Sequence, residues 1–542
     1  MAPVANIVRF FNTVRHLRPI QVYGRVRFRL AKPRPDLRPA PSMRPVVGTW
    51  CKPAERRPSM TGPDRFRFLN TEHALGEVGW DGPGLAKLWR YNEHYFDDLC
   101  SEGASLRAGW HRDLLLRWVA ENEPAHGTGW EPYPTSLRIV NWCKWMLAGN
   151  AFPSDCVQSL AVQARWLSRR LEWHLLGNHL FVNAKALAFA GCAFDGPEAD
   201  EWLARGIEIL RDQIPEQILE DGGQFERSPM YHALAVEDML DLFNLGRAYP
   251  GRLGALLPMV ESRLPAMRHW LAAMCHPDGE IAFFNDAAIG IHPSPLQIER
   301  YAGDLGFGST EPIRDGLTLL EQSGYARLQS DSGQTVAIFD VGRIGPDYLP
   351  GHAHADTLSI ELSVHGRRVL VNSGTSEYGT GAERSRQRGT AAHNTMTVDG
   401  VDSSEVWGGF RVARRALPID LEYTVDPGPR VACSHDGYRR LAGRPTHRRM
   451  LTMSSNGLRI DDFLAAPGRA QSHWHLRPGI TIARLGTGTF ALEPDGIGME
   501  FIDSLVDYTP STWHPEFGIT VSNGCLRASP AGAHSSVRIW WK

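Results

Sequence analysis

The spacing of apolar residues along the chain changes near residue 325, from a helical period to a strand period. Between residues 105 and 321 the apolar positions recur every three or four residues, as in Val157, Leu160, Ala164, Leu167 and Leu171. This spacing gathers apolar side chains on one face of a helix, so the segment predicts several amphipathic helices in succession. No strand pattern interrupts them, and no fixed repeat length is found. We therefore expect an all-α body, either a solenoid or, as the preferred interpretation, a toroid of helical hairpins.

After Gly324 the apolar residues recur with a period of two in short runs. These runs cover residues 335–339, 358–364, 369–371 and 395–398, and Gly, Asn and Asp separate them. A period of two with such breaks is typical of β-strands. The pattern continues at 458–460 and 537–541. The sequence thus predicts an α+β multidomain protein in which a helical domain precedes a large antiparallel β-sandwich, rather than a parallel α/β sheet.

The first sixty residues differ from both parts because they are rich in proline and arginine. Seven arginines lie between residues 15 and 38, interleaved with apolar residues. We interpret this segment as a basic arm packed on the body. The predicted organisation is an arm over residues 1–60, a toroid domain over 61–325 and a β-sandwich over 326–542.

Composition and charge exclude several classes of protein. The chain has 58 Lys and Arg against 60 Asp and Glu, a net charge of −2, so no global field favours nucleic acid. The longest strongly apolar stretch, 186–194, is far shorter than the roughly 20 residues that a membrane-spanning helix needs. Arginines interrupt the N-terminal segment, which predicts no export signal and, by that criterion, a cytoplasmic location. The eight cysteines contain no C-x-x-C pair, which argues against a zinc ribbon or a disulfide scaffold.

Two polar patterns interrupt the helical part. Asn178 and His179 stand in an otherwise apolar helical stretch, where they are costly unless they are hydrogen-bonded or face a cleft. A capping or buried structural role is equally compatible with them. The glycine-hinged loop 221–232 leads into a helix and brings Glu226, Arg227 and Tyr231 within one or two turns. Its Ser-Pro pair is also an ordinary helix start.

Three further patterns lie at the ends of predicted strands. In the segment 351–356 every second residue is His352, His354 or Asp356, and alternate side chains of an extended segment share a face, as metal ligands often do. Asn372 follows a predicted strand, and the segment 388–395 contains Arg388 and His393. Each pattern alone is a weak signal.

Taken together and in this order, these stretches resemble the heparinase II/III family of polysaccharide lyases. The similarity lies in GNHLFVN, DGGQFERSPMYH, GHAHADTLS and AAHNTMTVDG. The stretches LRPIQVYGRVRFRL, LWRYNEHYFDDL and YPTSLRIVNW are similar to members associated with bacterial surface polysaccharides and exopolysaccharides. The resemblance implies an incomplete (α/α) toroid, an antiparallel β-sandwich and an active-site cleft between them.

The resemblance also implies cleavage of a 4-linked uronic acid polysaccharide by β-elimination. Asn178, with His179 beside it, would neutralise the uronate carboxylate, which stabilises the carbanion-like state that forms. Tyr231 would be the general acid, and also the base if elimination is syn. His352 would be a base on the opposite face, suited to anti elimination, and His393 would orient the site or bind a metal. Further substrate contacts are expected from Arg138, Glu226, Arg227 and Arg388.

Some members of the family hold a structural divalent metal in the sandwich domain. The matching positions here are His354, Asn372 and His393, with Asn372 in place of the expected aspartate. A neutral amide is a poorer zinc ligand than a carboxylate, although Asp356 could replace it. We expect no cofactor for the chemistry itself, and a structural zinc or calcium ion stays an open alternative.

Two other functions stay open on the sequence alone. The chain could be a polysaccharide-binding or biosynthetic accessory protein without turnover, since a fold does not guarantee chemistry. It could also be a metal-dependent hydrolase of the H-x-H-x-D type, although Thr357 stands where such enzymes have a further histidine. The expected partner is an anionic polysaccharide that contains glucuronate, iduronate or mannuronate. Such a substrate would favour the periplasm or the cell surface over the cytoplasm.

Overall fold

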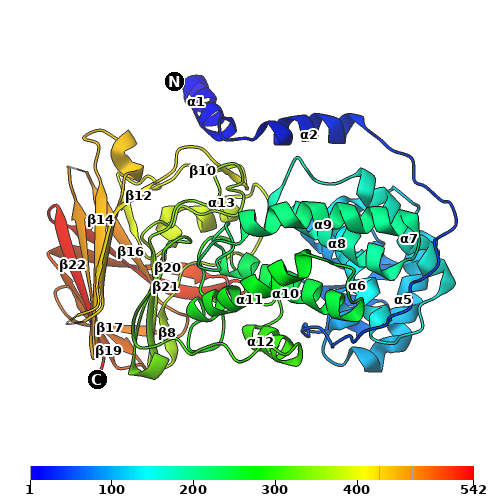
Figure 1. Ribbon diagram of the computed structural model, residues 1–542. Coiled ribbons are helices and arrows are strands. Elements are labelled where there is room, and N and C mark those ends of the chain that lie inside the picture. Colours follow the sequence, from blue (N-terminus) through cyan, green and yellow to red (C-terminus); the bar gives the residue numbers. More distant parts are fainter. Residues whose placement is uncertain (1, 427, 467) are drawn as a thin grey trace.

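The computed structural model describes residues 2–426, 428–466 and 468–542, and it consists of a helical part followed by a β-rich part (Figure 1). Short elements precede the helical body: a three-stranded sheet, β1 (Met60–Gly62), β2 (Arg65–Phe68) and β3 (Thr71–Ala74), and the helices α3 (Leu75–Val78) and α4 (Lys87–Glu93). The body is then built from α5 (Ala108–Glu121), α6 (Pro132–Leu147), α7 (Ser154–Arg169), α8 (Gly177–Ala193), α9 (Pro197–Gln217), α10 (Pro229–Ala248), α11 (Leu256–Ala273) and α12 (Pro295–Asp304). The predicted succession of helices between residues 105 and 321 is confirmed as far as Asp304.

Helix α8 lies at the centre of the helical part. From Leu180 to Ala193 every residue is buried, as expected of a helix that is apolar on all sides. Helix α9 packs closely against it because glycines stand at the contact. A Cβ on Gly191 would lie 2.7 Å from the carbonyl oxygen of Ala199, and one on Gly206 would lie 2.7 Å from that of Ala184. This packing fixes the position of the N-terminus of α8, where Asn178 and His179 lie.

The β-rich part is an antiparallel β-sandwich, as predicted. One layer is an eight-stranded sheet in the order β12-β13-β14-β15-β22-β19-β18-β17. The facing layer joins a five-stranded sheet, β4-β5-β6-β7-β8, to a four-stranded sheet, β20-β21-β16-β9, because the Val371 N–H donates to the carbonyl of His475 at 3.0 Å. The facing strands are β4 (Gly316–Leu320), β5 (Tyr325–Ser330), β6 (Thr335–Asp340), β7 (Ile360–Val364), β8 (Arg367–Leu370), β9 (Met396–Val398), β16 (Ala470–His475), β20 (Ser504–Trp513) and β21 (Val521–Pro530). The eight-stranded layer contains β12 (Pro418–Thr424), β13 (Arg430–His435), β14 (His447–Ser454), β15 (Gly457–Leu464), β17 (Thr481–Gly486), β18 (Thr489–Glu493), β19 (Ile497–Ile502) and β22 (His534–Trp540).

The inner strands β6 and β7 of the five-stranded sheet are buried on both faces. Ala337 and Phe339 of β6 point into the sandwich core, whereas Val336 and Ile338 pack in a second cluster with Trp270 of α11. The helical and β parts therefore share a buried apolar interface. Strand β4 begins at Gly316, so the β-sandwich begins before the predicted boundary at residue 325.

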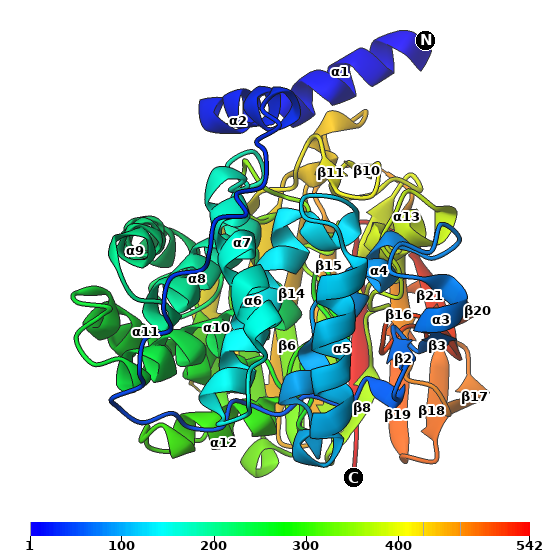
Figure 2. The same cartoon turned by 90° about the vertical axis from the view of Figure 1, so that its right-hand side faces the viewer.

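The N-terminal segment runs along the outside of the helical part. Residues 31–59 lie against the body, for example where the Arg44 N–H donates to the Ala193 carbonyl at 2.7 Å. Before them, α1 (Ala2–Val14) and α2 (Pro19–Leu30) form one outer edge of the molecule in both views (Figures 1 and 2). The expected basic arm is thus two helices and an extended strap. Among the described residues, no helix has the length and apolar character needed to cross a membrane.

Candidate active site

Asn178 and His179 form the first turn of α8, which faces the β-sandwich. Leu176 and Gly177 have positive φ values of 64° and 53°, and this bend ends the preceding loop and starts the helix. Asn178 is half-buried, and its side chain makes no hydrogen bond with the described residues. The free N–H groups and the dipole of a helix N-terminus favour an anion at this position. The Asn178 amide is therefore available to a negatively charged ligand.

His179 forms an ion pair with Glu172. The His179 Nδ1 lies 3.2 Å from Oε2 of the buried Glu172, which also accepts a hydrogen bond from Asn183 at 3.2 Å. Burial alone would lower the pKa of His179, but the Glu172 carboxylate raises it above its ordinary value. The imidazole also lies 4.6 Å from Tyr133 between ring centroids, with the two ring planes tilted by 47°. The Glu172 carboxylate thus favours the charged form of His179, the residue next to Asn178.

Tyr231 lies in the first turn of α10, which starts at the predicted Ser-Pro pair. The Ser228 hydroxyl caps the helix by accepting a hydrogen bond from the Tyr231 N–H at 3.2 Å. The phenol shares a 2.8 Å hydrogen bond with the hydroxyl of Tyr378. Burial, helped by Tyr378 and Asp286, raises the pKa of Tyr231 well above its ordinary value. The phenol is therefore protonated and suited to donate a proton.

His352 lies next to Tyr231 and carries a free ring nitrogen. The two ring centroids are 3.9 Å apart. The His352 Nδ1 donates to Oδ2 of Asp286 at 2.9 Å, so Nε2 is the ring nitrogen that remains for a substrate contact. The two groups therefore meet where the helical and β parts come together. The predicted placement of His352 on the face of the substrate opposite Tyr231 stays a prediction.

Glu226 links the two halves of the candidate site. Its Oε2 is buried and lies 3.8 Å from Nε2 of His352, and it accepts no hydrogen bond from the described residues. A Cβ on Gly177, the residue before Asn178, would lie 3.5 Å from its Oε1. Burial raises the pKa of Glu226. The site thus combines α8 and the 221–232 loop of the helical part with the 351–356 loop of the sandwich.

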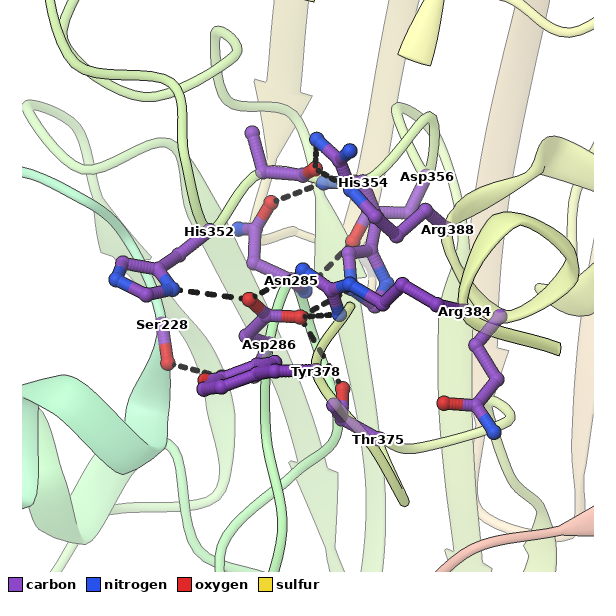
Figure 3. A network of polar contacts seen from close by, with 12 residues as sticks. Ser228, Asn285, Asp286, His352, His354, Asp356, Thr375, Tyr378, Arg384 and Arg388 are labelled. Carbon is purple, nitrogen blue, oxygen red and sulfur yellow. Dashed lines mark hydrogen bonds and ion pairs between the residues drawn. The ribbon is translucent and has the colours of Figure 1, made fainter. Parts of the chain in front are cut away.

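Asp286 is the centre of the polar network that orients these loops (Figure 3). It lies between α11 and α12 and is fully buried. It accepts hydrogen bonds from His352, from His354 Nε2 at 2.8 Å and from Arg384 Nη2 at 2.8 Å. Burial alone would raise the pKa of Asp286, but Arg384 and the two histidines hold it well below its usual range. The carboxylate therefore stays ionised and fixes the tautomers of both histidines.

Sequence reasoning missed Asp286, Tyr378 and Arg384. Asp286 follows Asn285, which has a positive φ of 57° directly after the apolar run 281–284. An Asn-Asp pair after such a run is an ordinary turn signal, so it did not indicate a site. Tyr378, in the loop before α13 (Ala382–Arg388), and Arg384, in that helix, have no local pattern that distinguishes them.

Three side chains near this network could hold a metal ion. His354, Asp356 and His393 offer ligand atoms that all lie within 4.8 Å of one another. His354 gives its Nε2 proton to Asp286, and His393 Nδ1 donates to the carbonyl of Gly389 at 2.9 Å. The remaining nitrogens, His354 Nδ1 and His393 Nε2, lie 3.1 Å apart and are both proton acceptors. Burial lowers the pKa of each histidine to about 4. A cation between them would remove this repulsion, so the residues fit a divalent metal.

Asn372 makes hydrogen bonds to neighbouring residues, and the predicted ligand set of His354, Asn372 and His393 stays a prediction. Its Oδ1 accepts a hydrogen bond from the Asn394 N–H at 2.9 Å, and its Nδ2 donates to the Phe283 carbonyl at 3.0 Å. The amide therefore ties strands together. Asp356 occupies the place of the third ligand.

Three arginines and one glutamate were predicted to contact substrate, and the structure places the arginines away from the glutamate. Arg138 is fully buried under Trp118, with its Nε donating to Gln163 at 2.9 Å. Arg227 points away from the site and donates to the Ser323 carbonyl at 2.9 Å. Arg388 is buried and holds the carbonyl of Ala353, between the two loop histidines. These arginines are structural, and Glu226 alone of the predicted contacts lies in the site.

Comparisons with known proteins agree with this geometry. The family model "Heparinase II/III N-terminus" matches residues 118–297, and "Heparinase II/III-like, C-terminal" matches residues 312–529. A heparin-sulfate lyase of Pedobacter heparinus is 27% identical over 46% of this chain and 40% of its own length. The chain thus spans less than half the length of this curated relative. The same holds for a heparin-sulfate lyase of Bacteroides thetaiotaomicron, which is 25% identical over 53% of this chain and 47% of its own length.

Solved structures share the fold. A crystal structure of heparinase III superposes with a TM-score of 0.65 at 18% identity, covering 82% of this chain and 76% of that one. A heparan sulfate lyase of Pedobacter heparinus gives a TM-score of 0.61 at 17% identity, covering 96% and 87%. These structures support an incomplete toroid followed by a β-sandwich. With both family models matched in order across the helical and β parts, the chain belongs to the heparinase II/III family.

Proposed function

We propose that this protein is a polysaccharide lyase that cleaves a 4-linked uronic acid polymer by β-elimination. The observation that carries the proposal is the meeting of Tyr231 and His352, which come from two separate domains and whose ring centroids lie 3.9 Å apart. The relatives named heparin-sulfate lyases support the same reaction class.

The first requirement of the reaction is neutralisation of the uronate carboxylate. Its negative charge opposes loss of the C5 proton, because the resulting carbanion delocalises onto the same group. The Asn178 amide, the protonated form of His179 and the N-terminus of α8 would stabilise this charge, an effect worth several kcal/mol when donors are preorganised. Burial raises the pKa of Glu226, a direction that favours its neutral form beside a substrate carboxylate.

The second requirement is proton transfer. His352 Nε2 would take the C5 proton, the C4–O4 bond would break as the C4=C5 double bond forms, and the Tyr231 hydroxyl would protonate the departing O4. Because the two rings are neighbours, we propose that both groups act from one side of the sugar, which makes the elimination syn. Syn elimination needs C5–H and O4 on the same face, which is the configuration of glucuronate and mannuronate. Iduronate has these two groups on opposite faces.

We propose further that His354, Asp356 and His393 bind a divalent cation of the zinc type. The positive charge of such an ion would join the 351–356 and 388–395 segments. The residues of this chain, His354 among them, hold Asp286, and Asp286 holds His352 in one orientation. His352 points its Nδ1 at Asp286 and is not in the ligand group, which argues against the metal-dependent hydrolase alternative.

A screen of uronate polymers tests the proposal against a binding protein without turnover. The unsaturated product of elimination absorbs near ~232 nm, so glucuronate- or mannuronate-containing polymers should give a rising signal with wild-type protein. Tyr231→Phe should give none, although it binds the same polymer. Binding without new absorbance for every polymer would support the accessory-protein alternative instead.

A further inference from the structure

The outer faces of α1 and α2 expose apolar side chains instead of burying them. Only a narrow stripe of α2 faces the body, where a Cβ on Gly24 would lie 3.0 Å from the His174 backbone nitrogen and the Phe28 ring lies 4.3 Å from that of His174. The rest of the surface of these helices contains exposed large apolar residues: Ile7, Val8, Phe10, Phe11, Ile20, Val22, Tyr23, Val26 and Leu30. An ordinary surface helix points such residues toward the core, so this contiguous face indicates a binding surface.

The same helices are strongly basic. Residues 1–35 contain no Asp or Glu, and they contain the basic residues Arg9, Arg15, Arg18, Arg25, Arg27, Arg29, Lys32 and Arg34. Of these, only Arg18 forms an ion pair within the described residues, with Glu216 at 2.5 Å. The chain as a whole has a net charge of −2, so the positive charge is a local feature of this arm.

We propose that α1 and α2 dock on the surface of an anionic lipid bilayer, with both helix axes in the plane of the interface. Aromatic and aliphatic side chains would enter the boundary between headgroups and acyl chains, while the arginines would bind lipid phosphates. A second copy of this chain is a poorer occupant because it would bring two basic arms together. A free anionic polysaccharide would satisfy the arginines but would leave the apolar side chains exposed to water.

This docking surface is fixed next to the candidate active site. The Arg18 guanidinium lies 3.7 Å over the Tyr348 ring, and Gln21 Nε2 donates to the Tyr348 carbonyl at 3.2 Å. Tyr348 precedes His352 by four residues, and His174, which contacts the other end of α2, precedes Asn178 by four. Lipid docking of the arm would therefore hold the site beside the membrane surface.

Vesicle co-sedimentation of the full chain tests this proposal. The probes are vesicles of phosphatidylcholine alone and of phosphatidylcholine mixed with phosphatidylglycerol. The wild-type protein should bind the mixed vesicles, weakly bind the neutral ones, and lose binding as salt is raised. Replacing Arg25, Arg27 and Arg29 with Glu should lower the partition coefficient by about 100-fold or more. The triple variant Val22→Ser, Val26→Ser and Leu30→Ser should also lose binding.

The matched control is Leu485→Ser with Leu505→Ser, because these leucines are 65% and 77% exposed on the sandwich. It should bind as the wild type does, and all variants should keep the wild-type melting temperature. The proposal would be overturned if the wild type did not bind mixed vesicles, or if the serine variant bound them unchanged. It would also be overturned if the wild type formed dimers that the serine variant abolishes, without any vesicle binding. Retention on an immobilised anionic polysaccharide in place of vesicle binding would also overturn it.

Discussion

The Nδ1 of His352 lies 2.9 Å from Oδ2 of Asp286, although 66 residues separate them in the sequence. Asp286 comes from the connection between two helices, and His352 comes from a loop of the β-sandwich. The contact therefore depends on the packing of one domain on the other. It also decides which nitrogen of His352 is free to take a proton.

Asp286→Asn should reduce kcat by at least about 10²-fold, because an amide can stabilise the wrong His352 tautomer. It should also lower Tm, since Arg384 would keep a buried charge without its carboxylate partner. His352→Ala is the comparison: it should reduce kcat as strongly with a much smaller change in Tm, because His352 is only partly buried. Equal losses of Tm in both variants would contradict the assigned roles.

Tyr231→Phe should reduce turnover by about 10²–10⁴-fold with little change in Tm or in polymer binding, since only the proton-donating hydroxyl is removed. Tyr378→Phe is the matched control. It removes the hydrogen-bond partner of Tyr231 but leaves the proposed acid, so its loss should be clearly smaller. Steady-state rates with both variants check this, and near-normal activity of Tyr231→Phe would require a different proton donor.

Glu172→Gln should lower the pKa of His179, because burial then acts without the opposing carboxylate. NMR titration of the His179 ring measures this, and Glu123→Gln, on an exposed glutamate, should cause no shift. The raised pKa means that the charged histidine contributes stability below its unfolded pKa of about 6.5, and this contribution is lost as pH rises through the folded pKa. Activity of Glu172→Gln should accordingly decline at a lower pH than activity of the wild type.

Asp356→Asn should reduce the zinc content of the purified protein, measured by elemental analysis. Asp340→Asn is the control, because Asp340 is buried nearby and its Oδ1 accepts a hydrogen bond from the Gly342 N–H at 2.8 Å. Chelation should lower Tm more than it slows the chemical step. If Asp356→Asn retains the metal while Asn372→Ala loses it, the ligand set has to be redrawn.

The sequence predicted the order of the two folds and the local segments of the site, but not the contacts between them. Periodicity located helices such as α7 and strands such as β6, because amphipathic spacing is a local property. Motif resemblance found Tyr231 and His352. Neither could show that Arg138 is buried beneath Trp118 or that Asn372 binds backbone groups, because both depend on residues far away in the chain.

The burial of strand β6 on both faces could not be predicted either, because it too depends on residues far away in the chain. Val336 and Ile338 look like ordinary strand residues, and only the position of Trp270 shows that their face meets the helices. The exposed apolar face of α2 was also hidden in the sequence. Its apolar residues suggested packing on the body, whereas only a stripe with Gln21 and Gly24 is buried.

The central claim is that the protein cleaves by elimination and not by hydrolysis. The most direct test is to digest a glucuronate polymer in ¹⁸O-labelled water and to measure the fragment masses by mass spectrometry. Elimination moves a proton from C5 to O4 and adds no water, so the fragment masses should sum to that of the parent and contain no label. Each cut should also leave one C4=C5 double bond at a new non-reducing end. Fragments that gain one labelled oxygen per cut, with no double bond, would contradict the lyase assignment.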